Sequence, residues 1–506
     1  MCRGWAWKLF SGPFSFRAMR TLDWVVAAAY VAGVVALGLW LGRRQAGASD
    51  YFLGRRSLPW WAVLVSVVAT ETSALTVISI PGIGFRGDLT FLQLAIGYVL
   101  GRMAVAWLLL PGYFRGEIST AYEVLGQRWG GGARKTASAI FLLTRALATA
   151  VRLFAGAIPL AVITGWSYPS AILAIGAATV LYTYVGGLRA VVWVDVIQWS
   201  VYMTAGAAAL LVAIQLAPGG LALAAEAGKL RVFDLGISLT APYAFGTAVL
   251  GGAFLSAASH GTDHLIVQRL LATRSIGAAR AALVGSGLVV AVEFSLFLLV
   301  GVAVWAAVPE LRSAAGDEVF PSFVATHLPA ALRGLVLAGI LAAAMGSTAS
   351  ALNSLASATT HDYYAPLTRT ADEGRLLRAG RLFTLLWALV LVGGALLFRN
   401  RDTPVVVVAL SIASLTYGAL LGTFVLARFE RVRQRDAVTA LVAGSVVMAV
   451  VVFAAQLAPL AGNPRWLVAL GRLAWPWYVP LGTGVTMALG LASSAVGGIR
   501  AVPRES

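Results

Sequence analysis

Long apolar segments recur along almost the whole chain and are separated by short polar stretches. A helix needs about 20 mostly apolar residues to cross a bilayer, and thirteen segments come close to or exceed that length. The pattern predicts an all-α polytopic membrane protein with about 13 transmembrane helices. The predicted spans lie near residues 23–42, 59–83, 88–113, 133–163, 168–185, 189–217, 243–265, 275–308, 331–357, 377–398, 404–428, 437–457 and 475–496.

The composition supports this interpretation. Of the 506 residues, 59% are hydrophobic and 12% are charged, whereas soluble chains are about half apolar and a quarter charged. This excludes a water-soluble enzyme and a disordered chain. The net charge of +17 is explained by basic residues in cytoplasmic loops, so we expect no nucleic-acid partner. The single cysteine, Cys2, excludes an intramolecular disulfide, and the His260/His264 pair lacks the glutamate of a zinc-binding HExxH motif.

Lys and Arg residues between the predicted spans indicate the orientation of the chain. With the N-terminus outside, the inner loops carry 22 basic residues and the outer loops 12. We therefore expect a single transporter domain over 23–498 in the cytoplasmic (inner) membrane, with tail 1–22 outside and tail 499–506 inside. Residues 1–18 add basic residues to the outer side, so we expect translation to begin at Met19.

Two predicted spans contain residues that break helices. The second carries polar side chains over 70–76, and the seventh carries Gly251, Gly252 and Gly261. Paired broken helices in corresponding positions of two inverted halves mark the binding site of many transporters. The alternative is that the small residues only allow close helix packing.

The two interrupted spans each open a block of five spans. The blocks cover 59–217 and 243–428, and 437–496 would then be accessory helices. Because five is odd, the second block enters the membrane in the opposite direction. The chain is therefore predicted to contain two inverted repeats.

Several stretches carry a resemblance to the sodium:solute symporter family, from about Asp23 to about Arg435. The most specific are GGLRAVVWVDVIQ (186–198) and STASALNS (347–354). The others are DYFLGRRSLPWW (50–61), SVVATETSALTVISIPG (66–82), TAYEVLGQRWGGGAR (120–134) and HLIVQRLLATRS (264–275). The resemblance implies the LeuT-type fold, a five-plus-five inverted repeat, and alternating access driven by a sodium gradient.

The resemblance also implies a sodium site. Its ligands would be backbone carbonyls of Ala69 and Thr72 on the second span, with Ala343, Gly346 and Ser347 on the ninth. Neutral oxygens of this kind suit a small hard cation that must leave again. The family usually has serine at the position of Gly346, so one hydroxyl ligand is missing here unless water, Thr348 or a shifted register replaces it.

Some members of the family have a second ion site, which would use Asp195 and Ser350 in this chain. Ala349 and Gly346 occupy other ligand positions of that site. Asp195 is therefore either a structural carboxylate, a protonatable group or a ligand of a working second site.

Ionisable side chains inside a span are costly and indicate function. Glu71 lies in the interrupted second span, and Arg145 and Arg152 share one face of the fourth. Three interpretations remain open: an arginine that binds a substrate carboxylate, a structural ion pair between Glu71 and one arginine, and snorkelling to the membrane face. We predict a carboxylate-bearing substrate, with Arg145 as the first candidate ligand and Arg152 as the second.

Five further residues are candidates for substrate binding. Ser256, Ser259 and His260 align with substrate-lining positions of sugar-transporting relatives, and Thr76 and Gln93 lie on the second and third spans. Their alternative roles are helix packing and structural hydrogen bonding.

Taken with the resemblance, these features imply a sodium-coupled secondary active symporter that imports a small organic solute. Its expected partners are the solute and the lipid bilayer, with Na+ as coupling ion, no other metal or cofactor and no obligate protein partner. A proton-coupled symporter that uses Glu71 is one alternative. A solute sensor would need a kinase domain, which we do not expect, and a membrane-embedded enzyme would show an aspartate-rich motif that this sequence lacks. There is no GxxxxGK[ST] motif for ATP.

Overall fold

The protein is represented by a computed structural model that describes residues 19–43, 45, 47–116, 118–314, 316–398 and 405–499. The segment 1–18, to which the expected start at Met19 refers, lies outside the described residues. The long helices are α2 (Thr21–Leu41), α4 (Trp60–Glu71), α5 (Ala74–Arg86), α6 (Gln93–Leu108), α9 (Gly131–Thr164), α10 (Tyr168–Leu216), α12 (Phe245–Gly261), α14 (Ile276–Ala307), α15 (Gly316–His327), α16 (Leu332–Ala358), α18 (Glu373–Leu397), α19 (Val405–Leu426), α20 (Gln434–Val452) and α23 (Tyr478–Ile499).

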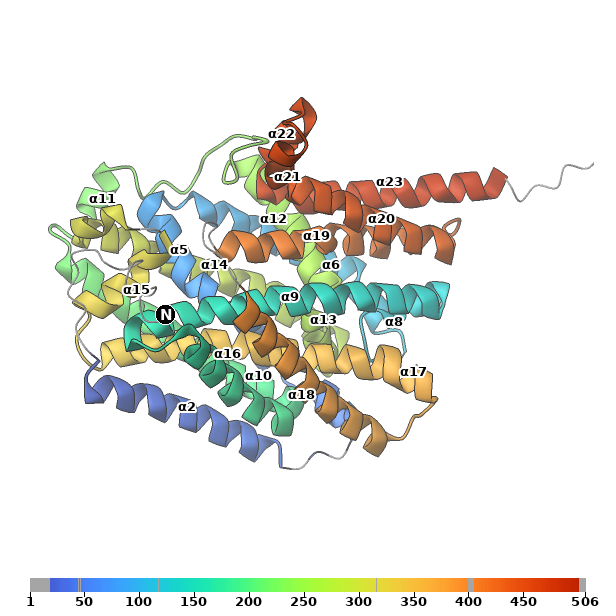
Figure 1. Ribbon diagram of the computed structural model, residues 1–506, viewed down its shortest axis with the longest axis horizontal. Coiled ribbons are helices and arrows are strands. Elements are labelled where there is room, and N and C mark those ends of the chain that lie inside the picture. Colours follow the sequence, from blue (N-terminus) through green and yellow to red (C-terminus); the bar gives the residue numbers. More distant parts are fainter. Residues whose placement is uncertain are drawn as a thin grey trace, which may run out of the picture.

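Short helices connect these elements (Figure 1). They are α3 (Ala48–Leu53), η1 (Gly54–Arg56), η2 (Thr90–Leu92), α7 (Leu110–Tyr113), α8 (Glu123–Trp129), α11 (Ala222–Glu226), α13 (His264–Leu271), η3 (Pro309–Ser313), η4 (Thr359–Tyr364), α17 (Ala365–Thr368), α21 (Ala454–Leu460), α22 (Arg465–Gly471) and η5 (Trp475–Trp477).

Each of the thirteen apolar segments lies on helical structure, so the prediction of an all-helical polytopic protein is confirmed. Among the described residues, nine helices are long and apolar enough to cross a membrane, and α4 with α5 forms a further span bent by 69°. The 49-residue α10 covers two of the predicted spans. Helices α12 and α19 cover the seventh and eleventh.

The chain turns within α10 at Gly187, where φ is 56° and ψ is −165°. Side chains other than hydrogen are strongly disfavoured in this conformation. A Cβ atom there would also lie 2.6 Å from the carbonyl oxygen of Tyr51. Gly187 therefore allows two consecutive spans to be joined with almost no loop.

We expect Gly187→Ala to lower the free energy of unfolding by about 1–3 kcal/mol because of backbone strain. Thermal unfolding of the purified protein in detergent measures this change. Gly33→Ala in α2 is the matched control, because a Cβ atom at Gly33 meets nothing within 4 Å. Equal stability of the Gly187 variant and the wild type would contradict the assignment of this turn.

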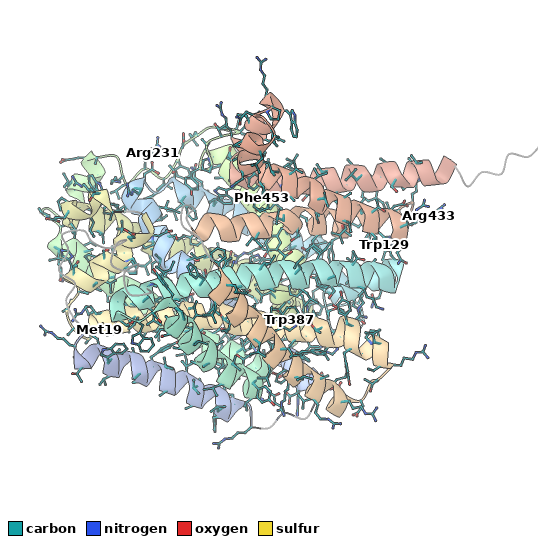
Figure 2. All side chains as sticks on the ribbon, in the orientation of Figure 1. Met19, Trp129, Arg231, Trp387, Arg433 and Phe453 are labelled. Carbon is teal, nitrogen blue, oxygen red and sulfur yellow. The ribbon has the colours of Figure 1, made fainter. Side chains whose placement is uncertain are left out.

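Helix α16 forms the centre of the bundle. In the apolar 18-residue segment of this helix 94% of the residues are buried, compared with 17% in that of α2 and 28% in that of α18. Helices α2 and α20 lie toward opposite edges of the molecule in Figure 1, as expected of helices that face lipid. Side chains fill the space between the helices, and Met19 and Arg231 lie toward the opposite end of the bundle from Trp129 and Arg433 (Figure 2).

Candidate functional site

The second span is broken as predicted. Helix α4 ends at Glu71, the backbone of Thr72 and Ser73 is extended, and α5 begins at Ala74. The backbone N–H of Ser73 donates to Thr76 Oγ1 at 3.3 Å, so it does not form the helical bond to the carbonyl of Ala69. The break therefore leaves a carbonyl oxygen available for an ion. Thr76 caps the start of α5 instead of pointing toward a solute.

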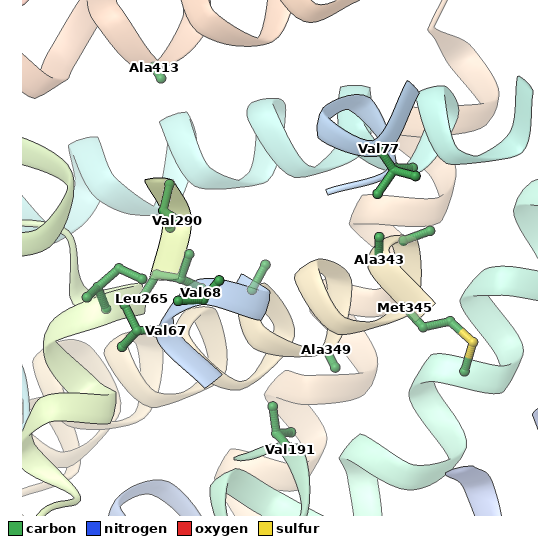
Figure 3. Close-up of a cluster of buried hydrophobic side chains, with 14 of the residues drawn as sticks. Val67, Val68, Val77, Val191, Leu265, Val290, Ala343, Met345, Ala349 and Ala413 are labelled. Atoms are coloured by element: carbon green, nitrogen blue, oxygen red, sulfur yellow. The ribbon is translucent and has the colours of Figure 1, made fainter. Parts of the chain in front are cut away.

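Helix α16 contacts both halves of the broken helix. Figure 3 shows Val68 of α4, Val77 of α5 and Ala343 of α16 within one cluster of buried side chains. Ser347 is buried, and its hydroxyl donates to the carbonyl of Ala343 at 2.9 Å. Because the hydroxyl donates its proton to its own helix, the lone pairs of its oxygen remain free to bind a cation.

The side of Gly346 that would carry a Cβ atom faces α10 and not the broken helix. A Cβ atom there would lie 2.5 Å from Gln198 Oε1 and 3.4 Å from Asp195 Oδ1, both on α10. The structure thus places Gly346 beside the residues of the second candidate ion site. A serine at this position would need Gln198 to move.

The second candidate ion site contains an arginine. Arg269 on α13 hydrogen-bonds Ser350 Oγ through Nη2, and the same atom lies 3.5 Å from Asp195 Oδ2. Its Nε donates to Ser66 Oγ at 3.0 Å. Arg269 falls between the seventh and eighth predicted spans, and its position in three dimensions depends on the turn that precedes α13.

Glu71 forms its ion pair with Arg102 of α6, so a structural pair with Arg145 or Arg152, one of the three interpretations left open, does not form among the described residues. Arg102 also donates to Ser286 Oγ at 2.6 Å and Ser256 Oγ at 3.4 Å. The close packing of α6 against α12 brings this guanidinium to the break. Arg102 lies inside a predicted span, so the rule that identified Glu71 could have identified it too.

The seventh span is not broken at Gly251 and Gly252, which corrects the prediction for these two glycines, whereas α12 does end at the third, Gly261. Helix α12 runs without interruption from Phe245 to Gly261. A Cβ atom at Gly252 would lie 2.7 Å from the carbonyl of Leu94, and one at Gly251 would lie 2.3 Å from Pro476. These glycines allow close helix packing, the alternative that the sequence left open.

The three candidates on α12 lie beside the Glu71–Arg102 pair. His260 Nε2 is 3.5 Å from Glu71 Oε2. Ser259 Oγ lies 2.8 Å from His260 Nδ1, and Ser256 donates to the carbonyl of Tyr98 at 3.1 Å. Together with Arg102 they form a polar cluster at the break.

Gln93 is fully buried, and its hydrogen bonds to described residues all involve backbone groups. Its Nε2 donates to the carbonyls of Tyr243 at 2.6 Å and Thr90 at 3.2 Å, and its Oε1 accepts the N–H of Asp234 at 3.2 Å. It therefore joins the loop before α12 to the start of α6, and its amide is engaged without a solute.

Arg145 is also paired. Its Nη2 contacts Asp263 Oδ2 and lies 2.7 Å from the hydroxyl of Tyr417, which donates to the same carboxylate oxygen at 2.8 Å. Asp263 in addition caps α13 by accepting the N–H of Leu265 at 2.9 Å. Our first candidate for a substrate carboxylate is therefore already neutralised by a protein carboxylate.

Arg152 lies two turns further along α9 and has no hydrogen bond or ion pair to another described residue. It faces the same narrow cavity as Arg145, which has room for about one water molecule. The cavity is bounded by α9, α19 and the residue before α13: Phe141, Thr144, Arg145, Ala148, Arg152, Asp263, Ala413, Thr416 and Tyr417.

Glu293 is not among the residues expected from the sequence. This fully buried carboxylate on α14 accepts a hydrogen bond from Thr72 Oγ1 and one from the hydroxyl of Tyr202 at 3.2 Å. It therefore holds the extended residue at the break. Its place inside a predicted span was a usable signal.

Comparisons with known proteins agree with this architecture. The sodium/sialic acid symporter NanT of Aliivibrio fischeri is 27% identical over 423 residues, which cover 81% of this chain and 83% of the relative. Sodium-coupled monocarboxylate transporter 1 of Mus musculus is 28% identical over 457 residues, 86% of this chain and 74% of the relative. A solved Na+-coupled sialic acid symporter in a substrate-bound, outward-open state matches with a TM-score of 0.82 and 25% identity, covering 94% of this chain and 98% of that one.

The structural match confirms the LeuT-type fold. A family model for the sodium:solute symporter family matches residues 51–444, which include the broken helix, α16 and all the polar clusters above. The chain therefore belongs to the sodium:solute symporter family.

Proposed function

We propose that this symporter imports a carboxylate-bearing solute together with sodium, and that Arg152 binds the carboxylate. The observation that carries the proposal is the charge state of the cavity. Arg145 is paired with Asp263, whereas Arg152 faces the same space without an ionic partner among the described residues. Arg152 is only partly buried, but an unpaired cation within a membrane span is still costly, and a substrate anion would offset that cost.

The chemistry of the solute follows from the guanidinium. Its planar fork forms two parallel hydrogen bonds to a carboxylate. Two of the relatives are named for sialic acid and for monocarboxylates, which are carboxylic acids. A small carboxylate is therefore the first class to test.

We propose sodium as the coupling ion, held at the break by the carbonyls of Ala69 and Thr72 with Ala343 and Ser347 of α16. These residues are buried beside the break, and the Ala69 carbonyl lacks its helical partner. By linkage, sodium and solute raise each other's affinity by the same factor. Proton coupling through Glu71 has less support, because Arg102 already neutralises that carboxylate.

We also propose the N-outside orientation in the cytoplasmic membrane, with inverted repeats at 59–217 and 243–428. The basic residues of the sequence support this orientation. Figure 2 supports the assignment of these segments to opposite sides of the membrane, since Met19 and Arg231 lie toward one end of the bundle and Arg433 lies toward the other.

Uptake into proteoliposomes under a sodium gradient tests the proposed function. The ligand is first identified by thermal shift, since a compound that binds the folded state raises the melting temperature. Uptake that follows a proton gradient equally well without sodium would contradict sodium coupling. A panel in which only neutral solutes bind would contradict the role of Arg152.

Ser347→Ala should raise the sodium concentration for half-maximal uptake about 5- to 10-fold. This corresponds to a loss of about 1–1.5 kcal/mol of sodium-binding free energy, which is similar to the contribution of one hydrogen bond. The variant loses a hydroxyl ligand but keeps the helix. Thr348→Ala is the matched control, because Thr348 lines a small space with Gly176 of α10 and Leu391 of α18 instead of the break. An unchanged sodium dependence in Ser347→Ala would place the ion elsewhere.

A further inference from the structure

Arg269 is a completely buried cation in the middle of four helices. It belongs to α13, but its guanidinium reaches Ser66 of α4, Asp195 of α10 and Ser350 of α16. The side chains of Arg269 and Asp195 both have zero exposure. The arginine is thus the positive charge that balances Asp195.

The groups around this guanidinium are oxygen atoms that also suit a small hard cation. Asp195 Oδ2 accepts from Ser66 Oγ at 2.5 Å, and Asp195 Oδ1 has no hydrogen-bond partner among the described residues. The hydroxyl of Thr70 lies 3.0 Å from that of Ser350. One carboxylate and three hydroxyls match the ligand preference of sodium.

We propose that the guanidinium of Arg269 is a tethered cation, a positive charge fixed to the chain, that occupies the place of a second sodium ion beside Asp195. The chain then binds one sodium ion, at the break between α4 and α5, instead of two. The inference rests on the proposed sodium coupling. Asp195 needs one positive charge nearby, because a lone buried carboxylate is destabilising. The guanidinium supplies that charge permanently, since it cannot dissociate into solution as an ion does.

The test counts bound sodium. Purified full-length protein is equilibrated with radioactive sodium at constant ionic strength, and the ions bound per chain at saturation are measured. Arg269→Ala removes the charge and leaves room for an ion, so we expect bound sodium to rise from one to two per chain. Arg269→Lys keeps a tethered charge and should bind one. Asp195→Asn combined with Arg269→Ala removes the carboxylate that attracts the ion and should also bind one.

Arg333→Ala is the matched control. Arg333 is another buried arginine and pairs with Asp23 at 3.0 Å. Asp23 also accepts the backbone N–H groups of Arg20, Ala331 and Gly334, so it is satisfied without a cation. We therefore expect no additional sodium in this variant.

Three outcomes would overturn the inference: an unchanged number of ions in Arg269→Ala, an equal gain in the double variant, or a gain in Arg333→Ala. If the Arg269→Ala variant is unstable without sodium, saturating sodium should restore its melting temperature. A melting temperature that stays low in saturating sodium would contradict the inference. Wild-type protein that binds no sodium would contradict the proposed coupling. In that case a gain of one ion in Arg269→Ala would still support the tethered cation.

Discussion

Replacing Arg152 by glutamine is expected to reduce sodium-driven uptake of the carboxylate solute about 30- to 1,000-fold, equivalent to about 2–4 kcal/mol. The glutamine amide is neutral and lacks the fork that binds both carboxylate oxygens. Because Arg152 has no ionic partner in the described part of the chain, the variant leaves no protein carboxylate unpaired. The protein should therefore fold normally, and thermal unfolding without solute should show a melting temperature close to that of the wild type.

Arg152→Lys separates the charge of the side chain from its shape. Lysine keeps the positive charge but not the bidentate geometry, so uptake should be impaired less than in the glutamine variant and more than in the wild type. Arg375→Gln is the control, because Arg375 is 66% exposed and pairs with Asp372 at the surface. Wild-type uptake by Arg152→Gln would assign the solute to another part of the bundle.

The sequence was sufficient to predict the break in the second span. Polar residues over 70–76 stand in an otherwise apolar run, and an unwound segment at mid-depth is tolerated only where it is buried or lines a cavity. The join at Gly187 fell between two predicted spans for a similar reason, since the glycine pair interrupts the apolar pattern. In both places the local sequence determines the local backbone.

The seventh span shows where this reasoning stops. Glycine both weakens a helix and allows another helix to approach closely, so Gly251 and Gly252 are compatible with either role. The neighbours decide the outcome. The carbonyl of Leu94 and the ring of Pro476 pack directly against these two glycines, and both come from elements distant in the sequence.

The pairing of charges was the least predictable feature. Glu71 forms an ion pair with Arg102, and Arg145 forms one with Asp263. A pair between Glu71 and an arginine of α9 was one of the interpretations that the sequence left open. Sequence spacing predicts neighbours on one helix, whereas ion pairs between helices depend on which helices are adjacent. The chain has several intramembrane charges, so many pairings satisfy the same electrostatic rule.

The Arg145–Asp263 pair predicts a large effect on stability. Both side chains are almost completely buried, with 5% and 2% exposure. Asp263→Asn should lower the free energy of unfolding by about 3–5 kcal/mol, because Arg145 would remain charged without a carboxylate. Asparagine keeps an oxygen that can cap α13, so the loss would report on the charge and not on the cap. Thermal unfolding of purified protein measures the change.

Two further variants separate the ion pair from its surroundings. Tyr417→Phe removes a hydroxyl that contacts both partners but leaves the charges opposed, so it should cost only about 1 kcal/mol. Arg145→Met combined with Asp263→Asn removes both charges and should recover most of the stability lost in Asp263→Asn. If the double variant is as unstable as the single one, the loss comes from packing around α13. Recovery would instead show that Asp263 neutralises Arg145, which leaves Arg152 as the cation available to a solute in this cavity.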